Sequence, residues 1–126
     1  MLRSLFLILF SVWLVACSAH DEQYYSTHPQ DLQRALNNCP KDSPKQVSCR
    51  TLEMIANRIN KYALELRTSP QGFGQEILAL QEKIAQQEKA LSQTRDQPDL
   101  KHALQENKIE LEQRLAVVRW LESPEG

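Results

Sequence analysis

Hydrophobic residues follow two different patterns along this chain. They form an almost continuous run from Ser4 to Leu14, and from residue 52 onwards they recur at spacings of three and four. The second pattern places apolar side chains on one face of an amphipathic helix. The first such seam consists of Leu52, Ile55, Ile59, Tyr62 and Leu66. We predict an all-α protein, in which Ser48 caps this helix and the helix ends at Thr68-Ser69-Pro70.

Two further seams lie in the second half of the chain. A break at Asp96-Gln97-Pro98-Asp99 separates them, with Asp96 as the expected cap of a last helix that runs from Leu100 to about Leu121. A loop of about four residues between two helices of about 20 residues makes them antiparallel neighbours. We therefore predict an antiparallel helical hairpin over residues 75–122. The seam residues are Ile77, Leu80, Ile84 and Leu91, then Leu104, Leu111, Leu115, Val118 and Leu121.

Residues 28–68 are predicted to form a smaller helical pair. Pro29 suits the first turn of a helix with Thr27 or His28 at its cap, and this helix is expected to stop near Asn38-Cys39-Pro40. Between the pair and the hairpin lies Pro70-Gln71-Gly72-Phe73-Gly74. We expect this stretch to be either a tight loop inside a bundle or a hinge between two helical units.

The apolar run at the start has the length of a signal peptide, since a membrane span needs roughly 20 residues. Arg3 precedes the run, and Leu14-Val15-Ala16-Cys17 closes it with a cysteine where a cleavage site would lie. This arrangement resembles the bacterial lipobox, which implies cleavage after Ala16 and a lipid on Cys17. An uncleaved N-terminal anchor and an ordinary secreted protein are the alternatives.

The lipobox assigns residues 1–16 to a lipoprotein signal peptide and residues 17–27 to a lipidated tether. Two or more acyl chains give stable membrane anchoring. In lipoproteins of this type, a serine such as Ser18 after the cysteine favours the outer over the inner membrane, with the domain facing the periplasm. Cys39 and Cys49 then remain, and in an oxidising compartment we expect them to form a disulfide. A zinc site is the alternative, but no histidine lies in this stretch and structural zinc takes four ligands.

Composition argues against several classes of function. Without residues 1–16 the chain has 110 of its 126 residues, and the net charge goes from −1 to −2 because Arg3 is lost. This near-neutral balance argues against nucleic-acid binding. The three glycines Gly72, Gly74 and Gly126 cannot form a Rossmann or phosphate-loop fingerprint.

Catalytic and metal-binding patterns are missing from the sequence. The histidines His20, His28 and His102 have no serine, cysteine or carboxylate at a motif spacing, so we expect them to be solvated or capping residues. We predict neither an enzyme nor a cofactor or metal site.

The segment Tyr24-Tyr25-Ser26-Thr27-His28-Pro29 lies between Cys17 and the cysteine pair. One tyrosine ring could simply pack on the following helix. Together with Cys17, Cys39 and Cys49, however, the segment resembles the EexN-type exclusion lipoproteins of conjugative plasmids over residues 17–56. The resemblance implies a contact with a component of an incoming DNA-transfer machine, to which Tyr24, Tyr25 and His28 would contribute. The hairpin extends beyond this family pattern.

These patterns favour a membrane-anchored, non-catalytic interaction module with an envelope protein as partner. The alternatives are a structural accessory of a type IV secretion or conjugation apparatus, and a coiled-coil envelope spacer that associates with itself through the hairpin.

Overall fold

The chain is all-α over the residues that the structure, a computed structural model, describes: 21–39, 41 and 47–123. No strand occurs among them, which confirms the predicted fold class. None of the helices in these ranges combines the length and the apolar character that crossing a bilayer requires. Cys17 and the predicted signal peptide lie outside the described residues.

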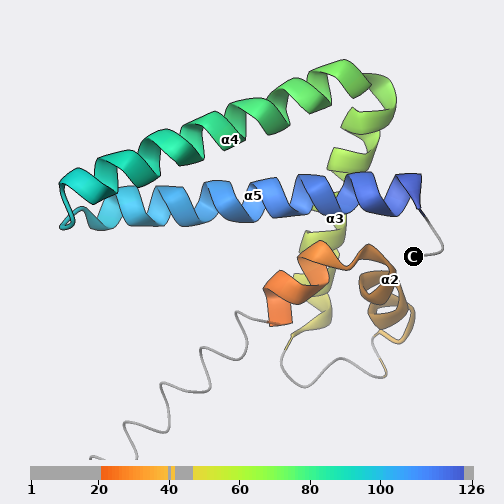
Figure 1. Ribbon diagram of the computed structural model, residues 1–126. Helices are drawn as coiled ribbons and strands as arrows, with labels where there is room; N and C mark the ends of the chain where they lie inside the picture. Colours follow the sequence, from red (N-terminus) through yellow and green to blue (C-terminus); the bar gives the residue numbers. More distant parts are fainter. Residues whose placement is uncertain (1–20, 40, 42–46, 124–126) are drawn as a thin grey trace, which may run out of the picture. The chain divides into compact units, whose positions relative to one another are not determined.

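Residues 21–27 are helical, and four helices follow them, α2 to α5 (Figure 1). The chain divides into two compact units, Met1–Asn57 and Arg58–Gly126, and the boundary falls within α3. The bounds are α2 Pro29–Asn37, α3 Cys49–Thr68, α4 Pro70–Gln93 and α5 Pro98–Glu122.

The first unit contains the helical residues 21–27, α2 and the start of α3. The sequence placed residues 21–27 in the tether, and in the structure they are helical. His28 interrupts the helical backbone, and α2 begins with Pro29 in its first turn as predicted. Leu32 and Leu52 are buried, with 2% and 0% of their surface exposed.

The helix α3 begins and ends where the sequence predicted. The hydroxyl of Ser48 accepts a hydrogen bond from the backbone N–H of Thr51 at 3.2 Å, which is the geometry of an N-terminal cap. At the other end, the hydroxyl of Thr68 donates to the carbonyl oxygen of Leu64 at 2.9 Å. The seam residues Ile59 and Tyr62 are buried, so the amphipathic pattern correctly identified the inner face of this helix.

The expected loop or hinge at Pro70–Gly74 is wrong, because α4 already begins at Pro70. The Ser69 hydroxyl accepts a hydrogen bond from the N–H of Gly72 at 3.3 Å, and proline at the first helical position needs no amide partner. Phe73 is 3% exposed, and burial of this ring in the first turn further stabilises the helix.

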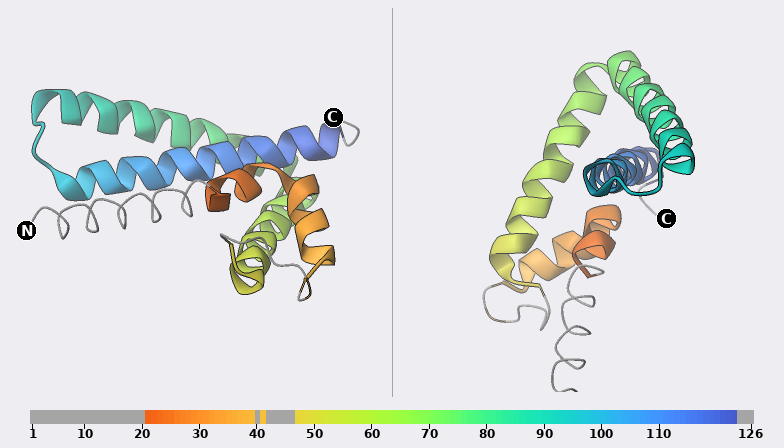
Figure 2. Two further views of the ribbon diagram at one scale, coloured as in Figure 1. Left: turned by 90° about the horizontal axis from the view of Figure 1, so that it is seen from below. Right: turned by 90° about the vertical axis from the view of Figure 1, so that its left-hand side faces the viewer.

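The helices α4 and α5 form the predicted antiparallel hairpin, and they run side by side in Figures 1 and 2. The connecting loop covers residues 94–97. The cap of α5 is Gln97, one residue later than the expected Asp96, and Pro98 occupies the first turn. Such a short loop places the two helices next to each other in antiparallel orientation, as expected.

Candidate interaction surface

The aromatic segment before α2 forms a small cluster in the first unit. The rings of Tyr24 and His28 are stacked, with centroids 3.9 Å apart and planes 14° apart. Tyr25 meets Tyr24 edge to face at 5.6 Å between the centroids. The structure therefore brings together the three side chains that the resemblance implied for partner contact.

Polar contacts within this cluster give it a local structural role. The hydroxyl of Tyr24 donates a hydrogen bond of 2.5 Å to Asp31, and this bond raises the pKa of the Tyr24 phenol. Nδ1 of His28 lies 2.7 Å from the carbonyl oxygen of Tyr24, and because a carbonyl only accepts, the ring nitrogen donates. The bond to Asp31 connects residues 21–27 with α2, while 41% of Tyr24 stays exposed.

The cysteines Cys39 and Cys49 form a disulfide, with their Cα atoms 6.0 Å apart. It joins the chain just after α2 to the first residue of α3. Val47 inside the closed loop is only 3% exposed, so the loop contributes to the core of its unit. The disulfide replaces the zinc site that the sequence left as an alternative.

The hairpin of α4 and α5 is held by a seam of inward-facing positions that alternate at spacings of four and three. In α4 these are Phe73, Ile77, Leu80, Ile84, Gln87 and Leu91, and in α5 they are Leu100, Leu104, Asn107, Leu111, Arg114, Val118 and Leu121. These residues are all buried or half-buried. The spacing is that of a coiled coil, in which two helices pair along a narrow apolar stripe.

Polar pairs define the register of this hairpin. The side-chain amide of Asn107 donates a hydrogen bond to Gln87 at 2.9 Å in the middle of the seam. Beside it, Lys108 and Glu88 form an ion pair at 2.7 Å. A slip of one helix against the other would break both contacts and leave half-buried amides unpaired, which costs free energy. The hairpin therefore has one defined alignment.

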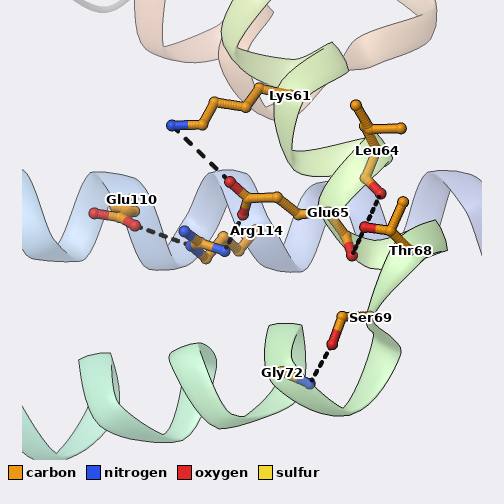
Figure 3. Close-up of polar contacts among 8 residues, drawn as sticks. All are labelled: Lys61, Leu64, Glu65, Thr68, Ser69, Gly72, Glu110 and Arg114. Carbon is orange, nitrogen blue, oxygen red and sulfur yellow. Dashed lines mark hydrogen bonds and ion pairs between the residues drawn. The ribbon is translucent and has the colours of Figure 1, made fainter.

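A buried arginine occupies the base of the hairpin and connects it to α3. Arg114 donates hydrogen bonds to Glu110 at 2.9 Å and to Glu65 of α3 at 3.1 Å (Figure 3). Its guanidinium lies over the rings of Tyr62 and Phe73, with 4.5 Å and 5.0 Å to their centroids. One side chain thus contacts α3, α4 and α5.

The charge of Arg114 is well compensated. Only 8% of its side chain is exposed, against 36% for Glu110 and 38% for Glu65. Burial alone would lower its pKa, but the hydrogen bonds and charges of Glu110 and Glu65 outweigh burial and raise the pKa. Burial also raises the pKa of the Tyr62 phenol, and the charge of Glu110 adds to this rise.

From Arg114 towards the connecting loop at residues 94–97, the hairpin continues as two paired helices. The part of α5 from Pro98 to Gln113 is about 24 Å long at about 1.5 Å per residue. Its outer positions, among them Glu82 on α4 and Glu106 on α5, are exposed and charged. We call residues 81–110 the distal hairpin. It presents a polar outer surface on a paired, aligned scaffold.

The remaining histidine in the described part, His102, lies on the distal hairpin and pairs with Glu106 at 3.3 Å on the surface. Among the described residues no group of three or more His, Cys, Asp or Glu side chains is placed to hold a metal ion.

Comparison of the chain with profiles of protein families, with curated proteins and with solved structures finds no match.

Proposed function

We propose that this chain is a lipid-anchored binding protein of the bacterial envelope, which contacts a partner protein through its distal hairpin. The observation that carries the proposal is the hairpin itself. It is a two-helix arm of fixed register that continues for about 24 Å beyond its buried base at Arg114. Its charged outer surface suits recognition of another protein.

The proposed anchor rests on the sequence. The apolar run, the preceding Arg3 and the closing Leu14-Val15-Ala16-Cys17 together support a lipidated Cys17. The disulfide between Cys39 and Cys49 fits an oxidising compartment such as the periplasm.

The resemblance of residues 17–56 to the EexN-type exclusion lipoproteins supports a more specific form of the proposal. In this form the protein contacts a component of an incoming conjugation apparatus and so prevents a second transfer of DNA.

Charge reversal on the distal hairpin tests this function. Glu82 and Glu106 are exposed, and neither belongs to the seam. In a recipient strain that carries the gene, the Glu82→Lys/Glu106→Lys double variant should raise the frequency of incoming conjugation roughly tenfold or more, because like charges at a contact weaken binding.

The matched control places the same change in the first unit. Glu22 and Glu53 are also exposed, so the Glu22→Lys/Glu53→Lys double variant adds the same charge away from the arm. It should leave exclusion at the wild-type level. Equal membrane levels of both variants, measured by immunoblot, make the comparison valid. Full exclusion by the distal variant, or an equal loss in the control, would reject the arm as the contact.

A coiled-coil spacer is the second candidate. It is favoured by seam residues in the distal hairpin that are only half-buried, namely Ile84, Leu91, Leu104 and Leu111. A spacer that associates through these residues would form discrete oligomers of the mature protein in detergent. Sedimentation as a single monomeric species would exclude it.

A further inference from the structure

The disulfide of the first unit joins two helix ends of opposite polarity. Cys39 follows the C-terminal cap Asn38 of α2, and its backbone N–H donates a hydrogen bond to the carbonyl oxygen of Leu36 at 3.0 Å. Cys49 is the first residue of α3. Carbonyl groups at a helix C-terminus carry partial negative charge, whereas N–H groups at a helix N-terminus carry partial positive charge. The two bonded sulfur atoms therefore lie in different electrostatic surroundings.

Exposed cations lie near both cysteines and leave this difference in place. Arg50 directly follows Cys49, and Lys41 lies two residues after Cys39. The first turn of α3 contains no acidic residue that would oppose a negative charge on Cys49. A thiolate at Cys49 is thus stabilised by a helix N-terminus, whereas a thiolate at Cys39 would lie at the negative end of α2.

Both cysteines are also partly accessible to solvent. They are half-buried, whereas Leu32 and Leu52 in the same unit are only 2% and 0% exposed. Buried structural cysteines are inert, while partly exposed cysteines in positive surroundings are the reactive ones. A thiol can therefore approach this disulfide in the folded unit.

We propose that this disulfide undergoes thiol–disulfide exchange with a dithiol protein of the oxidoreductase class, with Cys39 as the attacked residue and Cys49 as the leaving group. The attacking thiolate forms a bond to Sγ of Cys39, the bond between the two cysteines breaks, and Sγ of Cys49 leaves with the electron pair. The sulfur that forms the more stable thiolate leaves faster. The N-terminus of α3 therefore sets the direction of attack.

The second thiol of the dithiol protein completes the exchange. It loses its proton and attacks the sulfur of its own chain in the mixed disulfide, so that Cys39 leaves as a thiolate and takes up a proton. The dithiol is oxidised to a disulfide, and the cysteine pair gains two electrons. Reduction removes the covalent link between α2 and α3, and the reverse exchange restores it. The link would thus be a redox-sensitive switch of the first unit, independent of the contact proposed for the distal hairpin.

A neutral monothiol identifies the sulfur that is attacked. The mature protein in detergent is treated briefly with 2-mercaptoethanol at mildly alkaline pH, quenched with acid and alkylated. Trypsin cleaves after Lys41 and Lys45, which lie between the two cysteines in the sequence, so mass spectrometry measures the mixed disulfide on each cysteine separately. We expect at least about threefold more mixed disulfide on Cys39 than on Cys49, from the combined effect of the two helix ends.

Urea separates the effect of the helix ends from that of the neighbouring residues. It unfolds both helices but leaves Lys41 and Arg50 beside the cysteines in sequence, so the mixed disulfide should be distributed nearly equally. In the folded protein, Arg50→Glu should lower the excess on Cys39 about twofold, because an acid in the first turn of α3 disfavours a thiolate at Cys49. The exposed Arg58 lies about 14 Å further along α3, and Arg58→Glu should keep the full excess.

Three results would overturn the proposal. They are an equal distribution or an excess on Cys49 in the folded protein, the same excess on Cys39 in urea, and a disulfide that reacts only after unfolding. Neither tryptic peptide contains Cys17, so the measurement does not require a lipid on that residue. Exclusion of conjugation is a separate readout, and its loss or persistence in the distal-hairpin variant leaves the exchange result unchanged.

Discussion

Replacement of Arg114 tests how far one buried cation stabilises the second unit. Arg114→Ala removes two charge-assisted hydrogen bonds, of 2.9 Å and 3.1 Å, and the stacking on Tyr62 and Phe73. Such bonds contribute about 1.5–3 kcal/mol each, and we take the lower value because both carboxylates are more than one third exposed. The expected loss is about 3 kcal/mol or somewhat more, once the cation–π contacts are included.

Two other substitutions at position 114 separate the contribution of the charge to stability from the contribution of packing. Arg114→Met keeps most of the side-chain volume, and Glu65 and Glu110 remain hydrated on their exposed sides. It should therefore cost only about 1–2 kcal/mol. Arg114→Lys keeps the charge but loses the planar fork that reaches both carboxylates, so an intermediate loss is expected.

Thermal unfolding measures these losses. After removal of residues 1–16, Trp120 on α5 is the only tryptophan, so its fluorescence reports the second unit. A loss of about 3 kcal/mol corresponds to a fall in Tm of roughly 12–24 °C for a unit of this size. Arg119→Ala, an exposed arginine on the same helix, should change Tm by only a few degrees. Equal effects of Arg114→Ala and Arg119→Ala would refute the assignment of Arg114 as the buried link between the three helices.

Three further predictions concern the disulfide, a buried phenol and two glycines. Cys49→Ser should destabilise the first unit by about 2–3 kcal/mol, because the disulfide closes a loop with a sequence separation of 10; reductant should lower the Tm of the wild type to the same extent and leave the variant unchanged. In an ultraviolet titration, Tyr62 should ionise above the usual phenol pKa of about 10, since burial raises its pKa. Its contribution to stability is therefore present below pH of about 10 and is lost as the pH rises through the folded-state pKa; ionisation at the usual value would contradict its burial. Gly74→Ala should stabilise α4 by about 0.5–1 kcal/mol, because an added Cβ meets nothing within 4 Å. Gly72→Ala should give no such gain in chemical denaturation, because its Cβ would lie 2.7 Å from the capping hydroxyl of Ser69.

Much of the helical fold follows from local rules in the sequence. The spacing of Leu52, Ile59 and Tyr62 predicted the inner face of α3, and all three are buried. The four residues between the last two helices predicted their antiparallel pairing. The error at Pro70–Gly74 came from giving two glycines more weight than the preceding Ser69-Pro70, which is a strong signal for the start of a helix.

The base of the hairpin could be predicted only in part. Glu110 and Arg114 are four residues apart on one helix, a spacing that favours an ion pair, and the structure contains this pair. The burial of Arg114 depends on Tyr62 and Glu65, far away in sequence, and no local pattern contains them. A signal was present nevertheless, because Arg114 occupies a seam position between Leu111 and Val118.

The pairing of Asn107 with Gln87 could likewise not be predicted from the sequence. Each residue interrupts an apolar seam, and each alone weakens the prediction of a coiled coil. Only the register of the two helices shows that the interruptions face each other and form a hydrogen bond. A polar pair of this kind sets the alignment at some cost in stability.

Site-specific photo-crosslinking in native membranes tests the central proposal most directly. A photoreactive amino acid replaces Glu106 on the distal hairpin, and in a parallel strain it replaces Glu22 in the first unit, both of which are exposed. We predict that position 106 crosslinks to a protein subunit of a conjugation or secretion apparatus, identified by mass spectrometry, and that position 22 does not. Crosslinks from position 106 only to a second copy of this chain, or to no protein, would contradict the account.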